Sequence, residues 1–246
     1  MNNDIMIYGL QRSGTNYVEA LLVENFEGVQ IWNEHYPDCL PTQKHFRLYD
    51  EKHLIPSLQF QNNFLYDGFS DFDKHVSRLT EKSQLSYVVV VKHPLSWYLS
   101  YFNWASKKHH IDHRKKDVNG HFILEWNLFM KKWLAFQAEA PGRVHIVKYE
   151  DLIADHDTSL EAASSYLKLT KRHSDFFIPE KVGMSKGFGK KRLDYYKKKS
   201  YLDELPETHY RVIRELVDDN VLSDLGYEMK DSQPTYSHQK NYKATS

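Results

Sequence analysis

The decapeptide YGLQRSGTNY, Tyr8 to Tyr17, joins an apolar run to an amphipathic one. The preceding run, DIMIY, predicts a strand, and the following one, VEALLVENF, carries apolar residues at helical spacing. Gly9 and Gly14 permit turns and close approaches that a side chain would block. Hydroxyl and amide side chains stand where the helix begins: Ser13, Thr15 and Asn16. The stretch therefore predicts a cradle for an anion, because the N–H groups of a helix start attract negative charge.

The composition fits one globular domain. The chain has 246 residues, of which 41% are hydrophobic and 14% aromatic, enough to bury a core of the size common in α/β enzymes. We expect a single domain over residues 1–230. The polar segment 231–246 is expected to be a flexible tail.

The charge balance and the cysteine count limit the classes of partner and the cellular compartment that we expect for this chain. With 33 basic and 33 acidic residues, the chain has no global field to recruit nucleic acid or an anionic membrane. Cys39 is the only cysteine, which excludes an intrachain disulfide and suits a reducing compartment. No segment approaches the roughly 20 apolar residues of a membrane helix. We expect a cytoplasmic protein with no membrane span and no nucleic-acid partner.

Strands and helices alternate along the chain. The expected strands are residues 4–8, 29–32, 87–91 and 143–149, and the expected helices are 15–26, 72–82, 94–105, 122–140, 160–169 and 206–217. The run YVVVV, at 87–91, is apolar at successive positions and is expected at the centre of the sheet. Thr158 with Glu161 forms a capping-box pattern before the helix at 160–169. This alternation predicts an α/β fold in three layers, with a parallel sheet flanked by helices.

The loop departs from the usual nucleotide-triphosphate loop, G-x-x-x-x-G-K-[ST]. Gly9 and Gly14 keep the glycine spacing, but Thr15 stands where the lysine should be, and the basic residue is Arg12. The run YVVVV leads into Lys92 rather than into an acidic residue that would hold magnesium. An ordinary kinase or ATPase is therefore disfavoured.

Three segments together resemble the sulfotransferases that use 3′-phosphoadenosine 5′-phosphosulfate (PAPS), which share the phosphate-loop ancestry and work without metal. QRSGTNY resembles their first loop. In VVVVKHPLSWYLSYF, Lys92, Pro94 and Ser100 keep the spacing of their second signature, Arg-x-Pro with a later serine, which grips the 3′-phosphate. IVKYEDL resembles their Tyr-Glu-Asp-Leu stretch, whose tyrosine, here Tyr149, lies near the adenine. Lysine in place of arginine loses the bidentate fork but keeps the charge.

The last third of the chain resembles the family only loosely. SKGFGKKR is similar to a late basic loop over the 3′-phosphate, without its Arg-Lys-Gly triplet, and implies nucleotide contacts by Lys186 and Gly187. The basic run 186–199 is typical of a solvated segment, and its place in the chain also fits a lid over the nucleotide. The run KKHHIDHRKK, 107–116, has three histidines among five Lys or Arg, which would repel a dication, so we expect no metal site there.

The resemblance implies roles for residues around the loop. Arg12 is expected to stabilise charge on the bridging oxygen as the sulfuryl group leaves, and Tyr17 to stack on adenine. The acceptor must lose a proton, and His45, beside Lys44 in TQKHF, is the first choice of base. Two other residues, in WNEHY, remain alternative bases: Glu34 and His35.

The sequence thus predicts a PAPS-dependent sulfotransferase with the P-loop NTPase-like fold of that family and no metal. Its acceptor would be a hydroxyl or amine of a small molecule or glycan. The expected nucleotide contacts are Arg12, Ser13, Gly14, Thr15, Asn16, Tyr17, Lys92, Ser100, Tyr149, Lys186 and Gly187. The rivals are a metal-dependent small-molecule kinase and a catalytically silent nucleotide-binding protein of the same fold.

Overall fold

The computed structural model describes residues 3–34, 40–46, 66–109, 120–179 and 190–230. Several predictions from the sequence fall outside these ranges. They concern the tail 231–246, Cys39, His35, the histidine-containing run beyond residue 109, and the two late-loop residues Lys186 and Gly187.

A parallel sheet lies at the centre of the molecule. In the described part of the chain it has four strands, in the order β2-β1-β3-β4. They are β1 (Asn3–Tyr8), β2 (Val29–Ile31), β3 (Ser86–Val91) and β4 (Val144–Lys148). The register of β1 against β3 runs from Ile5 opposite Ser86 to Tyr8 opposite Val89. The central position of β3 confirms the prediction, and its valines are buried because both of its faces are covered.

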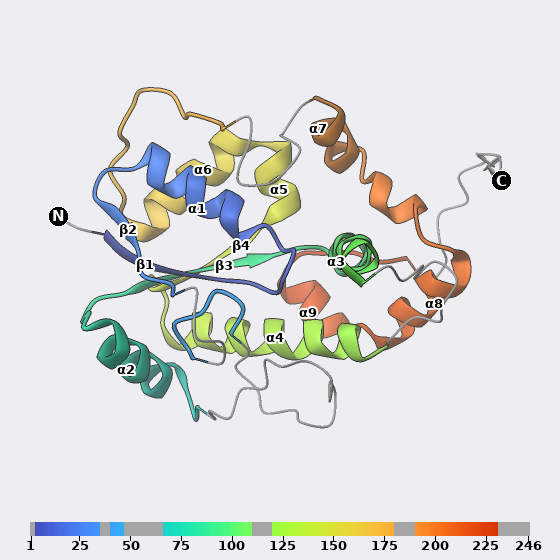
Figure 1. Ribbon diagram of the computed structural model, residues 1–246, viewed down its shortest axis with the longest axis horizontal. Coiled ribbons are helices and arrows are strands. Elements are labelled where there is room, and N and C mark those ends of the chain that lie inside the picture. The colour runs from blue at the N-terminus through green and yellow to red at the C-terminus, as the bar shows by residue number, and fades with distance from the viewer. Residues whose placement is uncertain (1–2, 35–39, 47–65, 110–119, 180–189, 231–246) are drawn as a thin grey trace.

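Helices cover both faces of this sheet. In Figure 1, α1, α5 and α6 lie above it, and α2 and α4 lie below. The helices of the described residues are α1 (Thr15–Asn25), α2 (Phe69–Thr80), α3 (Pro94–His109), α4 (Gly120–Glu139), α5 (Tyr149–Ala154), α6 (His156–Leu167), α7 (Lys190–Lys197), η2 (Ser200–Asp203, a 3-10 helix), α8 (Glu207–Leu216) and α9 (Asp219–Asp224). The expected three-layer α/β architecture is therefore confirmed. Within the described ranges, every helix is too short or too polar to cross a membrane.

The start of α6 corrects the capping-box prediction. The helix begins at His156, so Thr158 lies inside it, and the N-cap is Asp155. The Asp155 carboxylate accepts from Thr158 N at 3.1 Å and from Thr158 Oγ1 at 2.7 Å. Asp155 thus takes the capping position because its side chain reaches the N–H three residues ahead. Glu161 forms an ion pair with Lys171 instead.

Four short helices, α5, α7, η2 and α9, were not expected from the sequence. The strand predicted to include Tyr149 ends at Lys148, and the chain turns directly into α5. This turn matters for the site because it places the Tyr149 ring at the carboxyl edge of the sheet rather than within it.

Candidate active site

The three segments that carry the resemblance meet at one edge of the sheet. β1, β3 and β4 are parallel neighbours, so the residues that follow each strand emerge side by side. Gly9 follows β1, Lys92 follows β3 and Tyr149 follows β4. Ligands of open α/β sheets bind at this carboxyl edge.

The loop after β1 is built around its two glycines. A Cβ on Gly9 would lie 2.4 Å from Ser13 Oγ and 2.8 Å from the Val90 carbonyl oxygen, so only glycine lets the loop pack against β3. Gly14 has a φ of 106° and Arg12 a φ of 72°, both in the left-handed region. Ser13 Oγ is buried and makes no hydrogen bond within the described residues. A buried hydroxyl of this kind is available to a ligand.

Tyr149 connects this loop to Lys92. A Cβ on Gly14 would lie 2.5 Å from both Cδ2 and Cε2 of Tyr149, so the ring packs directly on the glycine. The Lys92 ammonium stands over the same ring, 4.1 Å from its centroid. The two parts of the sequence that suggested anion binding are therefore joined by a single buried aromatic ring.

Lys92 is a buried cation held by hydroxyl groups. Its side chain is 3% exposed, and Nζ donates to Ser100 Oγ and to Tyr196 OH, each at 3.3 Å. Among the described residues, no carboxylate oxygen lies within 4.0 Å of it. Burying a charge without an ion-pair partner in direct contact is unfavourable, so this position favours an anionic ligand.

Lys44 and His45 lie against the other side of the loop. Gly9 N donates to Lys44 O at 3.0 Å, and His45 Nδ1 lies 2.7 Å from Gly9 O. A carbonyl oxygen only accepts, so Nδ1 carries the proton and Nε2 of the neutral ring holds the lone pair. Lys44 Nζ donates to Asn16 Oδ1 at 3.2 Å and forms an ion pair with Glu19. Lys44 is thereby tied to the first turns of α1.

The other candidate residues differ in their exposure. Arg12 and Asn16 are exposed, whereas Thr15 is buried. Glu34, an alternative base, is exposed, and its carboxylate accepts from Thr42 Oγ1 at 2.9 Å.

Tyr17 is buried beside Tyr149, with an edge-to-face contact at 6.4 Å between ring centroids. Its hydroxyl lies 2.6 Å from His156 Nε2, and burial lowers the pKa of His156. The role of Tyr17 in adenine stacking stays a prediction.

A family model described as "Sulfotransferase domain" matches residues 2–203. The chain belongs to the sulfotransferase domain family. No curated protein sequence matches it.

Solved structures of sulfotransferases are similar to this sulfotransferase domain at low identity. The sulfotransferase domain from the curacin biosynthetic pathway is 15% identical, with a TM-score of 0.49, over 94% of this chain and 99% of that one. Mouse sulfotransferase SULT7A1, complexed with PAP, is 11% identical, with a TM-score of 0.49, over 92% and 89%. The sulfotransferase domain of the Synechococcus PCC 7002 olefin synthase is 12% identical, with a TM-score of 0.48, over 94% and 96%.

Sequence reasoning missed Glu150, a buried carboxylate that joins two of the segments at the candidate site. Its side chain is buried, and Oε2 accepts from His93 N at 3.1 Å and from Tyr227 OH at 2.9 Å. The bond to His93 joins the residue after Lys92 to the residue after Tyr149. Burial raises the pKa of the Glu150 carboxyl, and the positive charge of Lys92 opposes this shift. The motif YEDL contains this glutamate, but nothing in its spacing indicates a partner 57 residues away.

Two other contacts also come from distant parts of the chain. Trp97 Nε1, on α3, donates to the carbonyl of Gln11 at 2.9 Å and supports the loop from the side. Tyr196, on α7, reaches Lys92 from a segment expected to be solvated or a lid. No local sequence pattern distinguishes either residue from an ordinary core aromatic.

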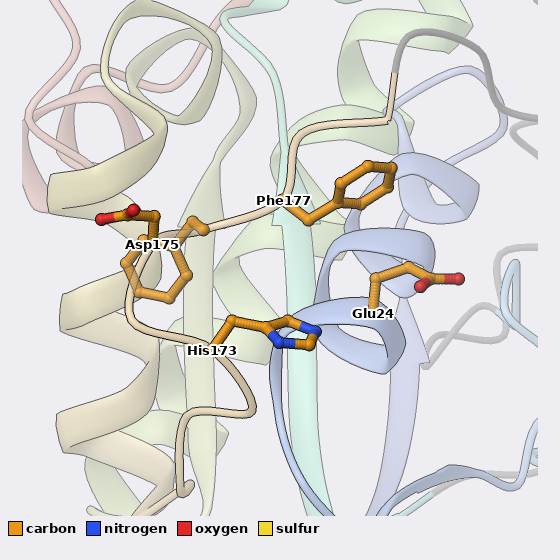
Figure 2. A pocket seen from close by; sticks show the side chains of 5 residues that line it. Glu24, His173, Asp175 and Phe177 are labelled. Atoms are coloured by element: carbon orange, nitrogen blue, oxygen red, sulfur yellow. The ribbon is translucent and has the colours of Figure 1, made fainter.

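A separate surface pocket lies at the far end of α1 from the loop. Figure 2 shows side chains from the C-terminal turn of α1 and from the segment after α6 around it. Its lining residues are Glu24, His173, Asp175, Phe176 and Phe177. It does not contribute to the site at the carboxyl edge.

Proposed function

We propose that this sulfotransferase domain moves a sulfuryl group from PAPS to a hydroxyl or amine of a small-molecule or glycan acceptor. The observation that supports this donor is the placement of the Tyr149 ring. It packs on Gly14 of the loop and lies beneath Lys92, 4.1 Å from the ammonium. A nucleoside with phosphate at both its 5′ and 3′ positions needs two anion sites separated by an aromatic surface.

Each end of the donor has its own binding groups in this proposal. The 5′ end meets the backbone N–H groups of the loop and of the start of α1, with Ser13 Oγ as a further donor. The 3′-phosphate meets Lys92 and Ser100. Both sets of groups are neutral or positive, as a polyanion requires.

The proposed reaction is an in-line displacement at sulfur. The acceptor oxygen or nitrogen bonds to sulfur as the bond from sulfur to the bridging phosphate oxygen breaks, and 3′-phosphoadenosine 5′-phosphate (PAP) leaves. The acceptor proton passes to His45 Nε2, whose lone pair follows from the Nδ1 contact with Gly9 O. The exposed Arg12 at the loop stabilises the negative charge that grows on the bridging oxygen.

Thermal shift with three nucleotides tests the donor class. PAP is expected to raise the Tm well above the values with AMP or ATP, because a ligand that binds the folded state stabilises it by mass action. Each nucleotide is measured with and without Mg²⁺. A larger shift with Mg²⁺ and ATP than with PAP would contradict the proposal and favour a kinase.

Turnover separates an enzyme from a silent binding protein. We expect PAP release from PAPS to depend on an added acceptor, tested with a panel of phenols, amines and sugars. Tight PAP binding with no acceptor-dependent release across such a panel would favour the binding protein.

A further inference from the structure

The hydroxyl of Tyr196 completes the polar surroundings of Lys92. The residue lies on α7, is 7% exposed, and places its hydroxyl oxygen 3.3 Å from Lys92 Nζ. Its ring meets that of Tyr149 edge to face, with centroids 5.2 Å apart, and that of Tyr201 at 6.3 Å. These contacts hold the phenol in place between the helix and the end of β3.

The chemistry of an ammonium group sets the direction of these hydrogen bonds. Lys92 Nζ has protons but no lone pair, so the oxygens of Ser100 and Tyr196 accept from it. Each hydroxyl therefore keeps its own proton for another acceptor. An anion beside Lys92 would meet one positive charge and two O–H donors.

The presence of lysine rather than arginine at position 92 explains why a further hydrogen-bond donor is needed beside the phosphate. A guanidinium presents two parallel N–H groups to one phosphate, whereas an ammonium acts as a point charge and leaves the second donor position empty. Tyr196 comes from an element remote in the sequence, 104 residues away, and brings a donor to that position.

We infer that Tyr196 binds the phosphate held at Lys92 directly and determines specificity for a 3′-phosphorylated nucleotide. The inference rests on the proposed function, since it takes that phosphate to be the 3′-phosphate of PAPS or PAP. The hydroxyl donates to a phosphate oxygen while it continues to accept from Lys92.

The substitution Tyr196→Phe isolates the hydroxyl, because phenylalanine retains the ring contacts with Tyr149 and Tyr201. Dissociation constants for PAP and AMP are measured by isothermal titration calorimetry. A lost hydrogen bond to a charged group is expected to weaken PAP roughly ten- to a hundredfold. AMP lacks the 3′-phosphate, so its affinity is expected to stay unchanged, and the ratio between the two ligands falls.

Tyr195→Phe is the matched control. Tyr195 is the neighbouring residue on the same helix, and its hydroxyl bonds to Glu204 rather than to Lys92. The control is expected to leave both dissociation constants unchanged. Its thermal unfolding, measured beside that of Tyr196→Phe, reports any loosening of α7 common to the two variants.

The outcomes separate the inference from the proposed function. If the unmodified protein binds AMP as tightly as PAP, the proposed donor is wrong. If it prefers PAP and Tyr196→Phe keeps the same ratio, or weakens both ligands equally, the role of Tyr196 is overturned while the donor stands.

A second pair of variants tests the reason given for the tyrosine. In a Lys92→Arg background the guanidinium supplies a second donor, so Tyr196→Phe is expected to weaken PAP less than it does beside Lys92. An undiminished loss in that background would contradict the inference.

Discussion

The substitution Gly14→Ala tests the contact that joins the loop to the rest of the site. Its new methyl group would lie 2.5 Å from two carbons of the Tyr149 ring, and the residue would keep a φ of 106°. The left-handed backbone costs a residue with a Cβ roughly 1–2 kcal/mol. Overpacking against a buried ring adds about 1–3 kcal/mol. We expect a total loss of roughly 2–5 kcal/mol in the free energy of unfolding.

Gly142→Ala is the control that separates these two costs. Gly142 has a φ of 88°, but a Cβ there meets no atom within 4 Å, so this variant carries only the backbone cost. The Tm of Gly14→Ala is therefore expected to lie below that of Gly142→Ala by roughly 2–12 °C, at about 2–4 °C per kcal/mol for a chain of this size. Thermal unfolding by circular dichroism measures both. Equal Tm losses would refute the reasoning, because the Tyr149 ring would then not press on the glycine.

Three further substitutions test individual side chains of the site. Lys92→Met replaces the buried ammonium group with an uncharged side chain of similar length. The free energy of unfolding is therefore expected to be unchanged or raised, while PAP binding weakens at least tenfold. Calorimetry and unfolding curves check this, and a lower Tm would contradict it. His45→Asn keeps a donor toward Gly9 O but removes the proposed base. The kcat is therefore expected to fall by about 10²–10⁴-fold, while the affinity for PAP is retained. An unchanged rate of PAP release would exclude His45 as the base. Glu150→Gln keeps an acceptor for His93 N and Tyr227 OH but does not titrate. Burial raises the pKa of Glu150 above its ordinary 4.5. The wild-type protein is therefore expected to lose stability relative to Glu150→Gln as pH rises from 4.5 through the pKa of the folded state. Above that pKa, the difference in stability between the two proteins levels off. Denaturant unfolding across this pH range measures it, and a constant difference would show that Glu150 does not titrate as described.

Local patterns in the sequence were enough to predict most of the elements. The apolar run at 87–91 indicated a strand covered on both faces, and β3 is indeed interior to the sheet. Pro94 was expected in the first turn of a helix, and α3 begins there. The predicted start of α6 was wrong, because the capping pattern at Thr158 does not show that Asp155 already caps the chain one turn earlier, at Thr158 N.

The three segments that carry the resemblance were predicted to bind one nucleotide, and the register of the sheet explains why they meet. Parallel strands bring their carboxyl ends to one edge, so the order of strands places Gly9, Lys92 and Tyr149 side by side. The direct contact of the Tyr149 ring with Gly14 and with Lys92 depends on the turn from β4 into α5, which was not predicted.

The amino-acid sequence by itself determined the alternation of strand and helix, the glycine spacing of the loop and the identity of its basic residues. These are properties of neighbouring residues, and short-range sterics and hydrophobic periodicity express them directly. Only the tertiary structure decided that Tyr196 lies beside Lys92, and that Glu150 joins the ends of two strands, since 104 and 57 residues separate these partners. Such contacts arise from how the helices pack at the edge of the sheet, and that packing depends on the whole chain at once.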